Sequence, residues 1–261
     1  MTMQNQAGQP ELHVVQGTVD DSDLGISAQA RAMPDLDRML DQLDRRSPRP
    51  IKALLDVGCG MGALTGRIGH RLGIERLIGI DCDLDRLAVA AERGIETHVV
   101  DLEAGPIPVP SRSVGLVTCF GVLAYLALYD QVLSEAARVL EDDGCFLFSM
   151  PNLASHQNRL AILLGYQPSQ VDVSSSFRGA GTLRKRPLNR TGMPPLLHAA
   201  TLRCMKELLD LNGFDVELVR GFSPRPFRNP ALRRAASHFP SLSRRFLILA
   251  RKRPGITLAH G

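Results

Sequence analysis

The sequence predicts an α/β fold with a doubly wound parallel sheet, and three observations support this prediction. Short apolar segments alternate with helical patterns between residues 51 and 150, a glycine-rich turn follows the first apolar segment, and an aspartate ends each of the next two. Alternating strands and helices specify a parallel sheet covered on both faces. With 261 residues, of which 44% are hydrophobic, the chain is long enough for one large domain and a cap.

The glycine-rich turn lies in residues 53–62, Ala-Leu-Leu-Asp-Val-Gly-Cys-Gly-Met-Gly. Asp56 falls within the strand, and Gly58, Gly60 and Gly62 alternate in the turn. Glycine lacks a Cβ and tolerates positive φ, so a ligand can approach the backbone closely there. The string also fits the dinucleotide pattern G-x-G-x-x-G/A, so the turn alone does not identify its ligand.

The other elements follow from apolar periodicity and from Gly, Pro and Asn breakers. Before the core we expect a mobile first dozen residues and a helix over Ser27–Leu43. In the core we expect helices over Ala63–Leu72, Leu84–Glu92 and Tyr129–Leu140, and strands over Arg76–Ile80, Glu96–Val100, Val114–Phe120 and Cys145–Met150. After Met150 we expect an amphipathic helix over Asn158–Leu164, a long lid or binding loop over Gly165–Pro195, a helix over Thr201–Leu211, and strands over Phe214–Arg220 and Phe246–Arg251.

Acidic residues stand where ligands bind in such a sheet, outside the carboxyl ends of the strands. Asp81 ends the second strand and Asp101 ends the third, while Asp56 lies within the first. A carboxylate can accept hydrogen bonds from both hydroxyls of a ribose. Asp56 would repel a pyrophosphate at the turn and would suit a ligand with an ammonium or sulfonium group. This favours another nucleotide ligand over NAD, and an NAD-dependent oxidoreductase stays as the weaker alternative.

Five ordered motifs in residues 51–150 resemble the class I S-adenosylmethionine-dependent methyltransferases. They are Leu54–Gly62, Gly79–Asp81, Val99–Leu102, Pro106–Pro110 with Ser113–Val117, and Arg138–Leu140 followed by Asp143–Gly144. Pro151-Asn152, Arg159-Leu160 and Leu164-Gly165 resemble members that act on small molecules, lipids or glycans. The resemblance implies a Rossmann-like sheet of seven strands, with strand 7 antiparallel, and a helical and loop cap over the substrate.

The same resemblance divides the chain into three parts. Residues 1–50 would form the mobile segment and first helix, and residues 51–150 the core that binds S-adenosylmethionine. Residues 151–261 would form the substrate-side insertion, the last helix and strands 6 and 7.

The resemblance also implies S-adenosylmethionine as the cofactor and assigns residues to it. The glycine turn would hold the methionine portion through backbone groups, with Asp56 nearby. Asp81 would bind the ribose, Asp101 the adenine amino group, and Cys82 and Leu102 would flank the adenine. The full expected cofactor set is Asp56, Gly58, Cys59, Gly60, Gly62, Asp81, Cys82, Asp101, Leu102 and Phe120.

Methyl transfer would require little from the protein beyond alignment of the acceptor. A hydroxyl acceptor, which we expect, also needs a general base within hydrogen-bond reach. Many relatives carry Glu-His after strand 4, where this chain has Ala124-Tyr125. The candidate catalytic residues are Tyr125, which offers a hydroxyl, and His156 and His198, which lie in the substrate-side part. The missing pair leaves open a non-catalytic protein of the same fold that binds S-adenosylmethionine as a partner or sensor.

Charge and composition narrow the partners. Residues 178–261 hold 17 of the 31 Lys and Arg but only 4 of the 27 Asp and Glu, which favours an anionic acceptor or a peripheral membrane contact. Arg225, Arg228, Arg233, Arg234, Arg244 and Arg245 would supply this basic surface. A nucleic-acid substrate is not expected, because strand 4 is not followed by a motif that could hold a flipped base.

The location and the metal content also follow from composition. The first ten residues are polar and uncharged, unlike a secretory signal, so we expect a cytoplasmic protein. The five cysteines are scattered without zinc-site spacing, so we expect reduced thiols and no metal.

Overall fold

The computed structural model describes residues 33–174, 176–177, 179–183, 196–222 and 238–255. Several sequence predictions lie outside these ranges. They are the mobile first dozen residues, the start of the helix at Ser27, residues 184–195 of the predicted loop, and the arginines Arg225, Arg228, Arg233 and Arg234.

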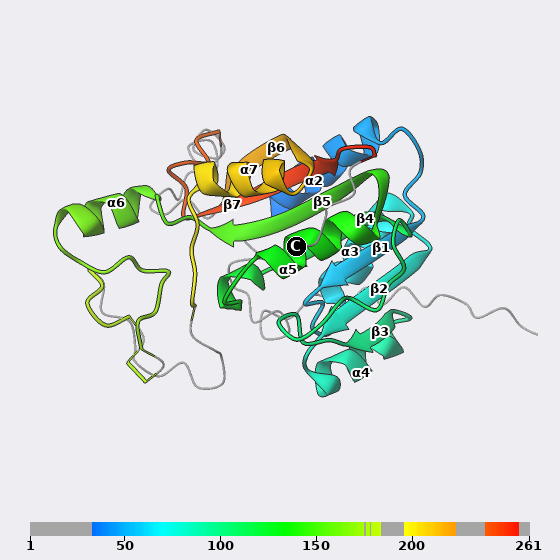
Figure 1. The fold of residues 1–261 in the computed structure, drawn as a ribbon, viewed down its shortest axis with the longest axis horizontal. Coiled ribbons are helices and arrows are strands. Elements are labelled where there is room, and N and C mark those ends of the chain that lie inside the picture. Colours follow the sequence, from blue (N-terminus) through cyan, green and yellow to red (C-terminus); the bar gives the residue numbers. More distant parts are fainter. Residues whose placement is uncertain (1–32, 175, 178, 184–195, 223–237, 256–261) are drawn as a thin grey trace, which may run out of the picture.

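A seven-stranded sheet forms the centre of the described part of the chain, with strand order β3-β2-β1-β4-β5-β7-β6 (Figure 1). The strands are β1 (Ala53–Val57), β2 (Arg76–Asp81), β3 (Glu96–Val99), β4 (Val114–Phe120), β5 (Leu140–Pro151), β6 (Phe214–Phe222) and β7 (Arg245–Lys252). The first five strands are parallel, whereas β7 is antiparallel to both β5 and β6. The predicted doubly wound sheet with an antiparallel strand 7 is confirmed.

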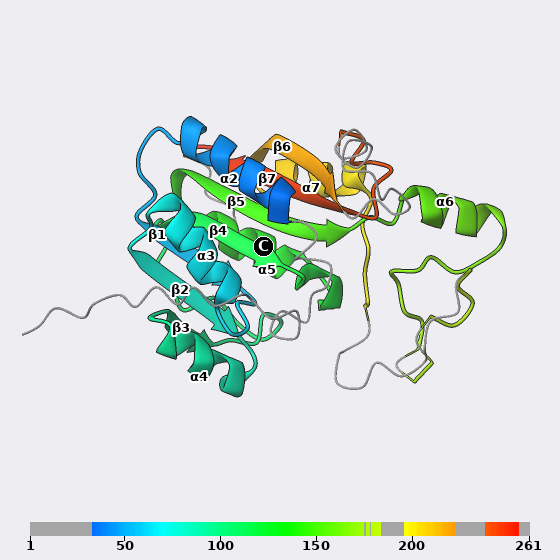
Figure 2. The same cartoon turned by 180° about the vertical axis from the view of Figure 1, so that it is seen from behind.

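Helices cover both faces of this sheet. Helices α2 (Met33–Arg46) and α3 (Ala63–Leu72) pack on one face, seen in Figure 2, and their apolar side chains form what we call the α2–α3 core. Helices α5 (Asp130–Val139) and α7 (Leu202–Leu211) pack on the other face in the α5–α7 core. Helix α4 (Leu84–Glu92) lies beside β2 and β3.

Most sequence predictions for single elements hold with small shifts at their ends, but β5 begins at Leu140, five residues before the predicted start at Cys145. Leu140, expected as the end of a helix, instead begins β5 and pairs with Val114, and an irregularity near Asp143 separates it from the main pairing at Cys145. The loop after β4 contains a short 3₁₀ helix, η1 (Leu123–Tyr125), that periodicity did not predict.

Helix α6 (His156–Leu163) projects beyond the carboxyl end of β5, away from the helices that cover the sheet (Figures 1 and 2). Its side chains Leu160, Ile162 and Leu163 are exposed. The helix therefore lacks the buried apolar face that the amphipathic prediction implied. No helix within the described ranges is long and apolar enough to span a membrane.

Candidate active site

The glycine turn joins β1 to α3 at the carboxyl edge of the sheet. The amides of Gly58 and Cys59 both donate to the carbonyl oxygen of Ile80 in β2, at 2.8 and 3.0 Å. Gly58, Gly60 and Gly62 all have positive φ, between 53° and 77°. This is the backbone conformation that favours glycine, so the turn is fixed against β2 in a shape that the three glycines allow.

The three glycines differ in what lies above them. A Cβ at Gly58 would come within 2.0 Å of Val122 Cγ2, and one at Gly62 within 2.3 Å of Ile95 Cδ1. A Cβ at Gly60 would meet nothing within 4 Å. Gly58 and Gly62 therefore permit close packing of the protein on itself, while Gly60 faces open space that a ligand could occupy.

Asp81 ends β2 and turns its carboxylate toward the glycine turn. Its Oδ2 accepts a hydrogen bond from the Gly60 amide at 2.9 Å, and its Oδ1 accepts one from the Asp83 amide at 3.1 Å. Each oxygen has a second lone pair. The carboxylate is therefore fixed in position and still able to accept the hydroxyls of a ribose. Cys82 follows it and is exposed.

Asp56 lies beneath the turn rather than on its surface. Its carboxylate is 3% exposed and accepts hydrogen bonds from the hydroxyls of Thr65, at 2.5 Å, and Thr118, at 2.7 Å. Burial raises the pKa of Asp56 to about 6, against the lowering effect of the two threonines. Asp56 holds α3 and β4 to β1, and it acts on the turn above through its charge.

The loop after β3 forms the next wall of the site. Asp101 Oδ1 accepts from the Glu103 amide at 3.0 Å, and Leu102 packs against the α5–α7 core. Glu103 Oε1 in turn accepts from the Ala127 amide at 2.5 Å. This contact ties the loop after β3 to the loop after β4, so the two predicted adenine contacts lie on a segment fixed at both ends.

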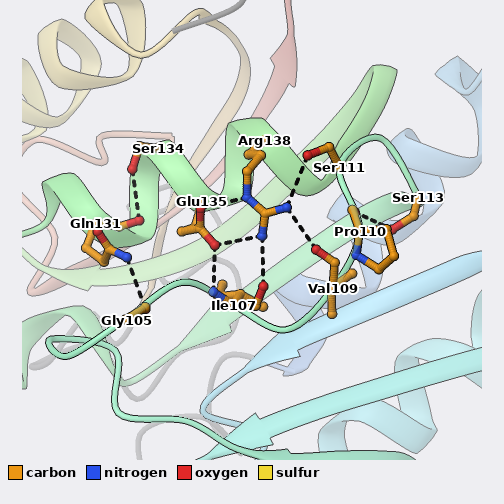
Figure 3. Close-up of polar contacts among 10 residues, drawn as sticks. All are labelled: Gly105, Ile107, Val109, Pro110, Ser111, Ser113, Gln131, Ser134, Glu135 and Arg138. Atoms are coloured by element: carbon orange, nitrogen blue, oxygen red, sulfur yellow. Dashed lines mark hydrogen bonds and ion pairs between the residues drawn. The ribbon is translucent and has the colours of Figure 1, made fainter. Parts of the chain in front are cut away.

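An ion pair on α5, between buried Glu135 and partly exposed Arg138, holds the rest of this loop (Figure 3). Glu135 and Arg138 pair within the helix, at 2.7 Å between Oε1 and Nε. The Ile107 amide donates to Glu135 Oε2 at 2.6 Å, while Arg138 donates to the carbonyl oxygens of Ile107 and Val109. The pair therefore satisfies the backbone of the proline-rich stretch, which has few hydrogen bonds of its own.

The loop after β4 brings a predicted catalytic residue to the glycine turn. The side chain of Val122 packs over Gly58, where a Cβ would otherwise lie. The Val122 carbonyl accepts a hydrogen bond from the Tyr125 amide at 2.8 Å. The Ala124 carbonyl accepts from the amide of His198 at 3.2 Å. Tyr125 and His198 thus lie on segments joined to each other, next to the turn. Phe120, at the end of β4, is buried in the α2–α3 core.

His156 lies at the start of α6, on the far side of the end of β5. Its Nδ1 donates to the carbonyl oxygen of Leu242 at 2.9 Å, since a carbonyl can only accept. Nε2 is therefore the acceptor nitrogen of the neutral ring. No direct hydrogen bond or ring contact that joins His156 to Tyr125 or His198 is found among the described residues. The segments of His156 and His198 are nevertheless joined, because the Leu153 amide donates to the Ala200 carbonyl at 3.1 Å.

Asn152 lies at the same edge of the sheet, and the sequence did not predict its structural role. Its side chain is fully buried, and Nδ2 donates to the carbonyl oxygens of Pro240, Ser241 and Ser243, at 3.3, 3.0 and 2.8 Å. Asn152 thereby fixes the turn that leads into β7. Only its position directly after a predicted strand could have signalled such a role.

The described residues hold no cluster of His, Cys, Asp or Glu that could bind a metal ion. Burial raises the pKa of the thiols of Cys59 and Cys119, and raises that of Cys145 to about 12. These cysteines are therefore neutral thiols at physiological pH, which disfavours them as nucleophiles.

Comparison with known proteins agrees with this geometry. Residues 55–148 match the methyltransferase domain family. Nocamycin O-methyltransferase from Saccharothrix syringae is 38% identical over 186 residues, which are 58% of this chain and 65% of that protein. Ubiquinone biosynthesis O-methyltransferase from Hahella chejuensis is 33% identical over 118 residues, 43% of this chain and 49% of that protein. The chain thus spans about half to two thirds of the length of these relatives.

A solved structure shows the same fold. It is an S-adenosylmethionine-dependent methyltransferase from Mesorhizobium loti, with a TM-score of 0.57 and 19% identity, and the match covers 85% of this chain and 98% of that one. The match to the methyltransferase domain family over the core, the curated relatives and the shared sheet lead to one conclusion. Residues 55–148 form a domain of the class I S-adenosylmethionine-dependent methyltransferase family, and S-adenosylmethionine is the cofactor of that family.

Proposed function

We propose that this chain transfers a methyl group from S-adenosylmethionine to a small-molecule acceptor, and that the acceptor atom is a hydroxyl oxygen. The arrangement at the carboxyl ends of β1 and β2 carries this proposal. There the Asp81 carboxylate is held against the Gly60 amide, beside a turn with open space above it. The hydroxyl acceptor is supported by the relatives, two of which are named as O-methyltransferases.

In this proposal the described residues divide into cofactor and acceptor groups. The turn Gly58–Gly62, which includes Cys59, holds the methionine portion. Asp81 and Cys82 contact the ribose side, and Asp101 and Leu102 contact the adenine. Asp56 supports the turn from beneath, and Phe120 backs it from β4. When bound, S-adenosylmethionine supplies an electrophilic methyl carbon.

The remaining work is to orient the acceptor and to take its proton. Tyr125 directs its hydroxyl at the acceptor from the loop after β4, and His198 is the better placed general base, because its segment is bonded to Ala124. His156 stays a second candidate at the edge of α6. Catalysis then depends mainly on alignment of the two reactants.

We further propose that the acceptor is anionic and is free or linked to a lipid or glycan. The excess of Lys and Arg in residues 178–261 supports an anionic acceptor. Phe239 and Leu242, which are exposed and lie within that basic segment, support a peripheral contact with an anionic membrane. The division of the chain at residues 50 and 150 belongs to the same proposal, as does a cytoplasmic location.

Two alternatives make different predictions for ligand binding. A non-catalytic partner or sensor of the same fold would bind S-adenosylmethionine without turnover, and replacement of the Glu-His pair by Ala124-Tyr125 favours it. An NAD-dependent oxidoreductase would place a pyrophosphate near buried Asp56, whose charge opposes it.

Titration calorimetry with S-adenosylhomocysteine, and with NADH as the control, tests the proposal first. We expect S-adenosylhomocysteine alone to bind. Binding of NADH alone would favour the oxidoreductase. A methyl-transfer assay that follows formation of S-adenosylhomocysteine, over a panel of phenols and alcohols with matched amines, then separates the enzyme from the sensor.

A further inference from the structure

Arg245 opens β7 at the same edge of the sheet as the candidate active site. Because β7 is antiparallel to β5, its first residue lies beside the last residue of β5, and Arg245 pairs with Pro151. Side chains alternate between the faces of a strand, and Leu247, two positions on, packs in the α2–α3 core. Arg245 therefore lies on that face, at its outer end, and is only partly exposed.

The Arg245 guanidinium has no carboxylate partner among the described residues. The two cations at the other end of β7 differ from it. Arg251 is paired with Glu217, and Lys252 donates from Nζ to the Leu140 carbonyl at 2.7 Å. Charged side chains are rarely withdrawn from water without such a partner, because desolvation of the charge is costly. The contrast within one strand indicates that Arg245 is built to receive its partner from elsewhere.

The polar groups near Arg245 do not neutralise it. Among the titratable side chains of the described residues, Tyr125, in the loop after β4, is the one that interacts with its guanidinium, and a phenol supplies no full negative charge at neutral pH. Ser149 lies on the same face, opposite Leu247, and its Oγ is buried without a hydrogen-bond partner among the described residues. Burial lowers the pKa of the Arg245 guanidinium. The surroundings thus disfavour the charge until an anion compensates it.

We propose that Arg245 binds an anionic group, a carboxylate or a phosphate, on the methyl acceptor. The planar guanidinium can donate two parallel hydrogen bonds to either oxyanion. The inference deepens the proposed function and rests on it, since it assigns the acceptor's acidic group to one residue. Arg245 lies at the active-site edge of the sheet, where β5 alone separates the start of β7 from the end of β4.

Strand spacing gives the approximate shape of such an acceptor. β4, β5 and β7 are neighbours in the sheet, and adjacent strands lie about 4.8 Å apart. The start of β7 is therefore roughly 10 Å from the end of β4 and about 14 Å from the glycine turn after β1. An acceptor that spans this edge would carry its acidic group roughly one to two strand spacings from the hydroxyl that is methylated.

The test measures binding rather than turnover, so it does not depend on the natural acceptor. The probes are 4-hydroxybenzoate, the neutral 4-hydroxybenzamide and 4-hydroxyphenyl phosphate, each titrated by ligand-observed NMR into protein saturated with S-adenosylhomocysteine. The proteins are the wild type, Arg245→Gln, Arg245→Lys and, as a control that removes one charge from an exposed site on α7, Arg203→Gln.

We expect the wild type and Arg203→Gln to prefer one or both anions over the amide by about tenfold or more. Arg245→Gln should lose that preference and Arg245→Lys should keep part of it. The anionic probe that binds more tightly shows whether the acidic group of the acceptor is a carboxylate or a phosphate. Equal binding of all three probes to the wild type, including binding of none, would overturn the inference, as would a preference that survives in Arg245→Gln.

Two controls separate the possible failures. S-adenosylhomocysteine titrated alone tests the proposed function, so loss of cofactor binding and loss of anion preference are read independently. Arg245→Gln removes no ion pair of the described structure and should therefore melt at or above the wild-type temperature. A large drop in its melting temperature would instead show a structural role for Arg245 and contradict the inference.

Discussion

Asp81 and Asp83 lie two positions apart, but their carboxylates have different tasks. Asp83 caps α4 by accepting from the amides of Asp85 and Arg86, whereas Asp81 faces the glycine turn. We expect Asp81→Ala to weaken S-adenosylhomocysteine binding by about 10- to 100-fold, the loss of one or two hydrogen bonds to a charged group. Asp83→Ala should cost about 1 kcal/mol of stability and leave the affinity unchanged. Titration calorimetry measures the affinities and urea unfolding measures the stabilities. An affinity of Asp81→Ala equal to that of the wild type would refute the ribose contact.

Gly58 and Gly60 separate a packing role from a ligand role at the same turn. Gly58→Ala would force a Cβ within 2.0 Å of Val122, so we expect a large loss of stability. Gly60→Ala meets open space and carries only the strain of positive φ, about 1 kcal/mol. Its Cβ should nevertheless block the cofactor. We expect a folded Gly60→Ala protein with little affinity for S-adenosylhomocysteine, and full affinity would move the ligand away from this turn.

Asp56 should make the protein less stable as the pH rises from about 4 to 6. Its folded pKa of about 6 lies above its ordinary value of 3.8, so the native state binds a proton that the unfolded chain has released. The stability lost by pH 7 is on the order of 3 kcal/mol, at 1.36 kcal/mol per pKa unit.

Asn in place of Asp56 cannot ionise and removes this effect. Urea unfolding at pH 4 and pH 7 should show Asp56→Asn gaining on the wild type with rising pH. Asp85→Asn, at an exposed site, serves as the control. A constant difference between Asp56→Asn and the wild type would mean that the buried carboxylate keeps an ordinary pKa.

At the scale of elements, helix α5 and the loop after β3 are held together by the pair in Figure 3. Arg138→Leu would leave Glu135 buried at 4% exposure without its cation, which typically costs 3–5 kcal/mol. Glu135→Gln keeps an oxygen for the Ile107 amide and should cost less. Urea unfolding measures both. Arg86→Leu, which breaks an exposed pair on α4, should change stability by no more than about 1 kcal/mol.

The order and type of the elements could be predicted because each repeats a local signal. Asp81 ends an apolar strand, and Gly73 and Gly213 each follow the end of a helix. Asp83 and Thr201 are ordinary N-caps. The end of α5 was wrong by one residue because Leu140 is apolar and fits either periodicity. Only its pairing with Val114 decides for the strand. Likewise, η1 is too short to show a period.

The site was predictable where it lies on one strand end and not where distant segments meet. The glycine turn, Asp81 and Asp101 could be assigned because strand order brings their ends together. The three hydrogen bonds of Asn152 to residues 240–243 join positions about ninety residues apart, and no local pattern encodes them. The place of Arg245 depends equally on β7 running antiparallel between β5 and β6.

For the whole molecule, the sheet order predicts where cofactor binding is felt. If S-adenosylmethionine lies over β1, β2 and the loop after β3, saturation with S-adenosylhomocysteine should slow amide exchange at residues 58–62, 81–83 and 101–107. Residues 214–222, on the far edge in β6, should be unaffected. At 100 times its Kd the ligand should add about 2.7 kcal/mol to stability and raise the melting temperature by roughly 5–10 °C.

Hydrogen exchange with mass spectrometry measures this pattern directly, and NADH at the same concentration is the control. Gly60→Ala, which should fold without binding, must lose the protection at all three segments together. Protection confined to α6, or present equally with NADH, would contradict a cofactor site at the β1–β2 edge. Protection at residues 58–62 and 81–83 without residues 101–107 would remove only the adenine contacts. The loop held by Glu135 and Arg138 would then serve the fold rather than the ligand.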